Sequence, residues 1–224
     1  MIDCLIFDLD GTLLDTMADL VDSTNDVLRE CGYPERTQEE IRGFVGHGAR
    51  RLIFQAVPET ATQEEAEAAL ALWQRRYPEM GYPKTAPYPG MLDTLNAMRS
   101  DGVKLGVLSN KFDEATKGNI NRFLPGVFHV VYGERPGVPR KPDPTGLLGV
   151  VEELGSTPKH AAYVGDSPVD MQVAKNAGMV AVGVSWGFNP VKSLLAAGAN
   201  VILDQPVQLL QYLATRGWEE DDYY

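Results

Sequence analysis

The chain has 224 residues, 44% of them hydrophobic, and its 31 acidic and 20 basic side chains give a formal net charge of −11. This length and apolar fraction are typical of a packed soluble protein with one large α/β domain, or a core domain plus a small second one. Because an acidic protein repels nucleic acid and anionic membranes, we expect neither as a partner.

The first third of the chain is predicted to be one buried strand followed by helices. Residues 2–7 (IDCLIF) are an apolar run typical of such a strand. Residues 18–31 place their apolar side chains on one helical face. Two copies of TQEE, at 37–40 and 62–65, fit a capping box and predict two helix starts. The Pro- and Gly-rich stretch 81–90 predicts a linker.

The rest of the chain alternates helices with short apolar strands. The strands are predicted at 103–108, 127–132, 161–164, 180–184 and 201–204. Such alternation is typical of a parallel sheet covered on both faces. We therefore predict an α/β fold, a doubly wound, Rossmann-like parallel sheet formed by residues 1–15 and 85–224. Residues 16–84 would form a small α-helical cap domain inserted after the first strand, above the sheet edge where ligands bind.

The amino terminus and the cysteines favour a cytoplasmic protein. An acidic residue, Asp3, stands where a secretory signal would carry basic ones, and no apolar run is long enough to span a membrane. The two cysteines, Cys4 and Cys31, are typical of reduced structural thiols. The sequence leaves open whether the protein is a monomer or a homodimer.

The sequence DLDGTLLD places Asp8 and Asp10 directly after the first predicted strand. Carboxylates there are costly to desolvate unless a charge or a reaction needs them. A hairpin turn fits poorly, because the residues that follow lead into a helix. An EF-hand calcium loop also fits poorly, since its sixth and twelfth positions would hold Leu13 and Asp19. Helix capping by Asp10 or Asp15 stays open.

Three further polar segments follow or precede predicted elements. Ser109 and Asn110 end a strand in VLSNK, where a hydroxyl and an amide can bind a phosphate oxygen. Lys141 lies in RKPDP, whose prolines fix where its ammonium points. Asp166 and Asp170 lie in YVGDSPVD, around a helix start. Each segment alone also has a plain structural interpretation: a loop start, a solvated lysine or a helix N-cap.

These segments should converge, because the carboxyl ends of parallel strands meet at one edge of the sheet. The four carboxylates of Asp8, Asp10, Asp166 and Asp170 would repel one another without a cation. All-oxygen ligands favour Mg²⁺, which also takes a substrate phosphate oxygen. Together with Lys141, such a metal site favours an anionic ligand, and phosphate fits best.

The motifs DLDGT, LSN, KPDP and VGDSPVD, in this order, resemble the four signature motifs of the haloacid dehalogenase-like hydrolases along the whole chain. The resemblance implies that Asp8 is the nucleophile, which forms an aspartyl-phosphate, and that Asp10 is the general acid and then base. It also implies that Ser109 and Lys141 bind and neutralise the phosphoryl group. Dehalogenases of this family lack the second aspartate, so its presence as Asp10 favours phosphoryl chemistry.

The resemblance extends to the metal site. It implies that Mg²⁺ is held by Asp8, Asp166 and the backbone carbonyl of Asp10. Asp170 would act as a ligand through water, or would support the other ligands.

The segment VGHGARRLI at 45–53 resembles the loop of the phosphoglycolate phosphatases that begins a helix over the active site, and SNK, KPDP and VSWGF also resemble that branch. Backbone N–H groups at Gly46 and Gly48 would approach a substrate carboxylate. His47 and Arg50 would add positive charge. The alternative is that His47 is an ordinary loop residue and Arg50 faces solvent.

We therefore predict a Mg²⁺-dependent phosphoric monoester hydrolase that acts on a small phosphorylated metabolite, with 2-phosphoglycolate as the leading substrate. Pyrophosphatases, other sugar-phosphate phosphatases and β-phosphoglucomutase-like enzymes share the same core and stay open. A silent phosphate-sensing module on this fold is the non-enzymatic alternative.

Overall fold

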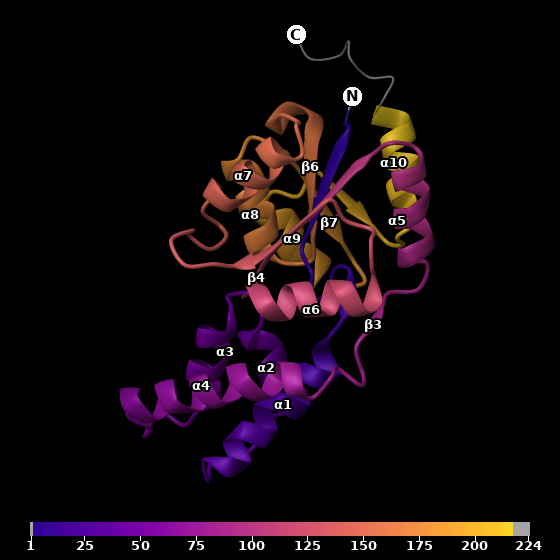
Figure 1. Ribbon diagram of the computed structural model, residues 1–224. Coiled ribbons are helices and arrows are strands. Elements are labelled where there is room, and N and C mark those ends of the chain that lie inside the picture. The colour runs from indigo at the N-terminus through magenta and orange to yellow at the C-terminus, as the bar shows by residue number, and fades with distance from the viewer. Residues whose placement is uncertain (1, 217–224) are drawn as a thin grey trace.

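The computed structural model describes residues 2–216, which are built around a parallel sheet of six strands (Figure 1). The strands are β1 (Cys4–Phe7), β4 (Lys104–Phe112), β5 (Val130–Glu134), β6 (Ala161–Gly165), β7 (Val180–Val184) and β8 (Val201–Leu203). Their order is β5-β4-β1-β6-β7-β8, and each neighbouring pair is parallel. The chain therefore winds away from β1 in both directions, which confirms the doubly wound sheet and opens a ligand crevice at the carboxyl end of β1.

Helices cover both faces of the sheet, and the side chains of β1 show why. Leu5 and Phe7 pack on one face and Cys4 and Ile6 on the other, because successive side chains of a strand alternate. The helices packed on the first face are α5 (Met91–Ser100), α6 (Asp113–Phe123) and α10 (Gln208–Arg216). Those on the second are α7 (Thr145–Glu153), α8 (Pro168–Asn176) and α9 (Val191–Ala197), and a 3₁₀ turn at Pro158–His160 precedes β6. A strand buried on both sides is apolar throughout, as β1 is.

A separate group of helices lies beyond the carboxyl ends of the strands (Figure 1). These are α1 (Met17–Glu30), α2 (Gln38–Phe44), α3 (Ala49–Ala56) and α4 (Gln63–Glu79), and they share a hydrophobic cluster of their own. We call this group the helical unit. Both predicted capping boxes are present, with Thr37 paired to Glu40 and Thr62 to Glu65. They start α2 and α4 where the sequence predicted helices.

A short antiparallel pair joins the helical unit to the sheet. It consists of β2 (Leu14–Asp15) and β3 (Ala86–Pro87). The predicted domain limits at 15/16 and 84/85 fall at this pair, and the division into domains stays a prediction.

Two strands, β4 and β5, differ from their predicted limits by three residues or more at one end. β4 continues to Phe112 through the polar residues of SNK, with an irregular register against β5 after Leu108. β5 begins at Val130, since Pro125 and Gly126 turn the chain just before it. Val127 is apolar because it packs in the core from this turn, and apolar character alone does not distinguish a buried turn from a strand.

The structure also bears on the predictions about membrane-spanning segments and about the two cysteines. Among residues 2–216, no helix is both long enough and apolar enough to cross a membrane. Cys4 and Cys31 are both free thiols, and Cys4 is buried in β1.

Candidate active site

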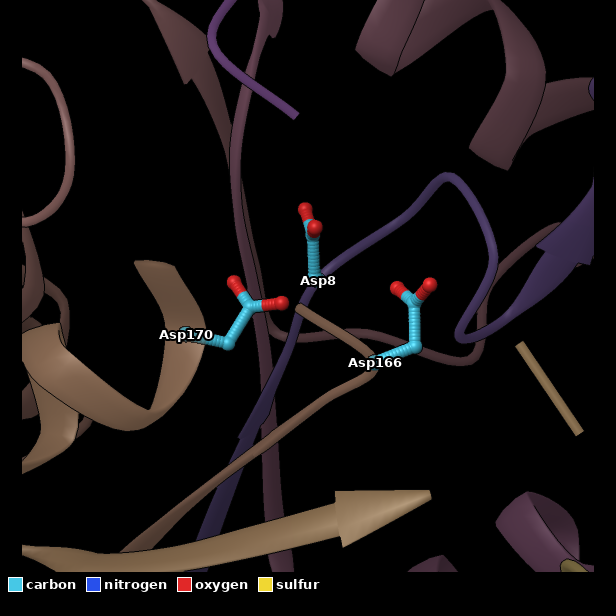
Figure 2. Close-up of side chains that lie close together, drawn as sticks. All are labelled: Asp8, Asp166 and Asp170. Atoms are coloured by element: carbon cyan, nitrogen blue, oxygen red, sulfur yellow. The ribbon is translucent and has the colours of Figure 1, made fainter. Parts of the chain in front are cut away.

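Asp8, the first residue after β1, is buried beside two other carboxylates. Asp166 follows β6, and Asp170 lies in the first turn of α8. One carboxylate oxygen from each of the three lies within 4.8 Å of the others. Figure 2 shows the three side chains gathered around one shared space. The parallel sheet thus brings together three of the four aspartates that the sequence singled out.

Lys141 is the cation of this cluster. Its Nζ lies 3.0 Å from Oδ1 of Asp8 and 2.8 Å from Oδ1 of Asp170. It also donates a hydrogen bond to the Tyr163 hydroxyl at 2.8 Å, and that hydroxyl donates to the carbonyl oxygen of Leu108 at 2.6 Å. Burial acts to lower the pKa of Lys141, but the carboxylates of Asp170 and Asp8 outweigh it and hold that pKa well above its ordinary value.

Asp8 and Asp166 both have raised pKa values. Burial raises the pKa of Asp8 to about 6, with Asp170 and Asp10 adding to the rise and Lys141 opposing it. Burial raises the pKa of Asp166 to about 8, helped by the charges of Asp170 and Asp8. Both shifts have the same physical cause, which is negative charge crowded into a buried space. A cation placed there would relieve the crowding.

The donor set fits a small hard cation such as Mg²⁺. Every side-chain donor in the cluster is an oxygen. Among the described residues, Oδ1 of Asp166 accepts one hydrogen bond, from Thr12 Oγ1 at 3.1 Å, and Oδ2 accepts one from the Phe188 N–H at 2.8 Å. The backbone around Asp166 is packed closely. A Cβ on Gly11 or Gly187 would lie only 2.5 Å or 2.2 Å from Asp166 atoms. Asp8 and Asp166 therefore keep free lone pairs in a rigid setting.

Both carboxylate oxygens of Asp170 already accept hydrogen bonds from neighbouring groups. Its Oδ1 accepts from Lys141, and its Oδ2 accepts from the backbone N–H of Ser167 at 2.9 Å and from its hydroxyl at 2.6 Å. Ser167, and not Asp166, is the N-cap residue of α8. Asp170 thus orients Lys141 and closes the start of α8, and its role at the metal, through water or in support of the other ligands, stays a prediction.

The side chain of Asp10 points to a second cation, Lys111. Lys111 Nζ lies 2.9 Å from Oδ1 and 3.2 Å from Oδ2 of Asp10, and Thr16 Oγ1 donates to Oδ1 at 2.7 Å. The Asp10 side chain is therefore outside the three-carboxylate cluster, and only its backbone carbonyl is left as the predicted metal donor. Sequence reasoning gave Lys111 no role, because a lone lysine after Ser-Asn carries no signal for its partner.

Asn110 links three segments around the site. Its Oδ1 accepts from the backbone N–H of Lys141 at 2.9 Å, and its Nδ2 donates to the carbonyls of Lys141 and Gly46 at 3.2 and 3.1 Å. Ser109, at the same strand end, is buried, and its Oγ accepts from the N–H of Lys111 at 3.3 Å. Asn110 thus fixes the Lys141 loop and the loop before α3 relative to β4.

A cavity lies between the sheet edge and the helical unit. The residues lining it include Asp8, Asp10, Asp166, Ser109, Asn110, Lys111, Gly46, Gly48, Leu20, Leu52, Trp73, Phe112 and Phe188. The volume of this cavity is about 40 Å³, which is room for only a few water molecules.

Three of the predicted substrate-binding residues, Lys141, His47 and Arg50, lie outside the lining of this cavity. His47 is half-buried, and its carbonyl accepts a long hydrogen bond from Arg140 at 3.5 Å. Arg50 forms an ion pair with Glu67 at the exposed surface and stacks over Phe54. The two neighbouring glycines do line the cavity, and a Cβ on Gly48 would come within 3.0 Å of the Asn110 carbonyl. The substrate contacts of His47 and Arg50 stay predictions.

We expect Asp166→Asn to stabilise the metal-free protein and to remove its response to Mg²⁺. Because the pKa of Asp166 is about 8 in the folded protein against an ordinary value of 3.8, the metal-free wild type loses stability as pH rises between these values. Asparagine keeps the size and the Phe188 contact without that loss. At pH 8 the gain should be at least about 1 kcal/mol, roughly the equivalent of one pKa unit.

Urea unfolding in EDTA and in Mg²⁺ measures both effects. The wild type should gain stability from Mg²⁺ by mass action, whereas the variant should not. An equal Mg²⁺ gain in both proteins would show that Asp166 holds no metal.

Comparison with known proteins identifies the family of the chain. The family model of the haloacid dehalogenase-like hydrolases matches residues 5–184. The chain belongs to this family. A phosphoglycolate phosphatase of Pseudomonas putida is 34% identical over 92% of this chain and 78% of that protein. A phosphoglycolate phosphatase of Aquifex aeolicus is 31% identical over 93% of this chain and 95% of that protein.

Solved structures show the same fold for this hydrolase. A crystal structure from Lactobacillus delbrueckii subsp. bulgaricus is 34% identical, with a TM-score of 0.87 over 94% of this chain and 98% of that one. A predicted phosphoglycolate phosphatase from Haemophilus somnus is 25% identical and has the same TM-score. The family and these relatives identify the chain as a phosphatase, a phosphoric monoester hydrolase.

Proposed function

We propose that this hydrolase is a Mg²⁺-dependent phosphatase that works through an aspartyl-phosphate on Asp8 and that its substrate is 2-phosphoglycolate. The observation that carries the proposal is the setting of Asp8, a buried carboxylate held 3.0 Å from Lys141 beside two further aspartates. The names of the relatives from Pseudomonas putida and Aquifex aeolicus support the choice of substrate.

The first step transfers the phosphoryl group to Asp8. A carboxylate oxygen of Asp8 attacks phosphorus, the bond from phosphorus to the leaving oxygen breaks, and Asp10 gives its proton to that oxygen. Like charges would oppose this attack, and the Lys141 ammonium offsets the repulsion. The Ser109 hydroxyl, which lines the cavity, binds a phosphoryl oxygen.

The second step regenerates the enzyme. Asp10, now a carboxylate, removes a proton from water as the water oxygen attacks phosphorus. The bond between phosphorus and Asp8 breaks, and inorganic phosphate leaves. Asp10 serves both steps because it lines the cavity but stands apart from the three-carboxylate cluster.

The residues that would hold Mg²⁺ are Asp8, Asp166 and the backbone carbonyl of Asp10, with Asp170 supporting them. When bound, the ion would supply positive charge that offsets the negative charge of the phosphoryl group. Asp170 keeps Lys141 directed at Asp8 through its 2.8 Å ion pair.

The small cavity and its lining support a small substrate. Gly46 and Gly48 line the side formed by the helical unit, where their backbone N–H groups would meet a substrate carboxylate. Leu20, Leu52 and Trp73 make the rest of that side apolar and exclude water from the reacting centre. The cytoplasmic location, a monomeric or homodimeric state and the lack of a nucleic-acid partner stay predictions from the sequence.

Phosphate release from a panel of small phosphoesters tests the proposal. The panel contains 2-phosphoglycolate, sugar phosphates, pyrophosphate and p-nitrophenyl phosphate, each with Mg²⁺ and with EDTA. We expect release that requires Mg²⁺ and a kcat/KM for 2-phosphoglycolate at least about tenfold above the other members, the equivalent of one good polar contact to its carboxylate. Preference for pyrophosphate or a sugar phosphate would overturn the substrate, and release in EDTA would overturn the metal requirement.

A further inference from the structure

We propose that Lys111 positions Asp10 for proton transfer and that Tyr77 makes this arrangement depend on the helical unit. The inference rests on the proposed function, because it concerns the step in which Asp10 protonates the leaving oxygen. It goes beyond that function by giving a role to Lys111, which the sequence motif SNK contains without implying a role for it, and to Tyr77, which lies in none of the motifs.

The Lys111 ammonium is buried with three oxygen partners. Its side chain is only 3% exposed, and that of Asp10 is 13% exposed. Nζ contacts both carboxylate oxygens of Asp10, at 2.9 and 3.2 Å, and the Tyr77 hydroxyl at 2.9 Å. An ammonium has three N–H donors, so these contacts use all of them.

Lys111 controls the orientation of the Asp10 carboxylate. Oδ1 also accepts from Thr16, but the hydrogen bond that the structure records for Oδ2 comes from Lys111. Without Lys111, the Asp10 carboxylate would be held only by the hydrogen bond from Thr16 to Oδ1 and would be free to rotate about it. Proton transfer needs the acid within hydrogen-bond reach of the leaving oxygen, so a loss of orientation slows that step.

Tyr77 connects this pair to the helical unit. It lies in α4 and is fully buried, whereas Lys111 lies in β4 and Asp10 follows β1. The Tyr77 ring stacks on Trp73, with centroids 4.7 Å apart, and Trp73 lines the cavity. The position of α4 over the sheet edge therefore determines whether Lys111 has its third partner.

A simple charge-neutralising role for Lys111 makes a different prediction. A structural ion pair would affect all substrates alike. A residue that acts through the proton of Asp10 should matter for a leaving group that needs this proton and matter little for one that leaves as a stable anion. Ethyl phosphate and p-nitrophenyl phosphate differ in this respect, and neither carries a carboxylate that Lys111 could bind.

The experiment compares kcat/KM for these two esters, because this ratio covers only the steps up to loss of the leaving group. Lys111→Met should lower it at least about a hundredfold for ethyl phosphate, the size of a general-acid contribution. The loss for p-nitrophenyl phosphate should be below about fivefold, the scale of one hydrogen bond.

Tyr77→Phe should show the same pattern with a smaller loss, about three- to tenfold for ethyl phosphate, because it removes one hydrogen bond to Lys111. Tyr82→Phe is the matched control, since its ring lies 5.0 Å from that of Tyr77 while the Lys111–Tyr77 bond stays intact. Thermal unfolding of all variants shows whether they fold.

Equal losses on both esters in folded Lys111→Met, or no loss on either, would overturn the inference while leaving the phosphatase proposal in place. A Tyr82→Phe loss as large as that of Tyr77→Phe would overturn the role of Tyr77. No phosphate release by the wild type from either ester or from 2-phosphoglycolate would overturn the proposed function, and the inference with it.

Discussion

Asp8→Asn should lower kcat at least about ten-thousandfold while leaving the protein folded. The amide oxygen is a far weaker nucleophile than the carboxylate, so the first covalent bond to phosphorus cannot form, and loss of a nucleophile has effects of this size in other enzymes. The fold should survive because burial already raises the pKa of Asp8 to about 6, so a neutral side chain relieves an existing cost. Phosphate release and thermal unfolding measure the two effects.

The matched control is Asp3→Asn, because Asp3 lies just before the start of β1 and Asp8 just after its end. Asp3 is exposed, and its Oδ1 accepts a hydrogen bond from Ser156 at 2.6 Å. This variant should keep wild-type turnover. If Asp8→Asn kept more than about one-hundredth of the wild-type kcat, a nucleophilic Asp8 would be excluded.

Lys141→Met should remove both activity and stability. Its ammonium is the cation paired with Asp8 and Asp170, and its raised pKa keeps it charged at neutral pH. Loss of this charge removes the group that offsets repulsion during attack by Asp8, and kcat/KM should fall about a thousandfold. It also leaves buried carboxylates unpaired, which should lower the free energy of unfolding of the metal-free protein by about 3–5 kcal/mol.

Steady-state kinetics and urea unfolding test the two expectations separately. Lys159→Met is the control, because this lysine is exposed in the 3₁₀ turn before β6. It should change neither measurement by more than about 0.5 kcal/mol. A Lys141→Met protein as active as the wild type would contradict the assignment of Lys141 to the phosphoryl group.

The sequence was sufficient to predict which segments converge. Asp8, Lys141 and Asp166 each carry a charge at a strand end or in a stiff loop, and the rule that parallel strands end at one edge then places them together. β1 was predictable because both of its faces are buried, which makes its residues apolar. The starts of α2 and α4 were predictable because a capping box is a local pattern.

The contacts between distant segments could not be predicted in the same way. Lys111 meets Asp10 and Tyr77 across 101 and 34 residues of chain, and no local pattern encodes such a partner. The ion pair of Arg50 with Glu67 on a neighbouring helix was likewise not encoded in its own segment, and its substrate contact stays a prediction. The direction of such a side chain depends on how its helix is oriented in the fold, and residue spacing within one segment does not predict that orientation.

The central claim is that phosphorus becomes bonded to Asp8 during turnover. The most direct measurement is to quench the enzyme in acid within its first turnover of 2-phosphoglycolate and to locate the phosphoryl group by peptide mass spectrometry, with Asp8→Asn as the blank. We predict a phosphoryl group on the peptide that contains Asp8, and on that residue, in the wild type and none in the variant. Turnover without a label on Asp8, or a label on another residue, would contradict the account.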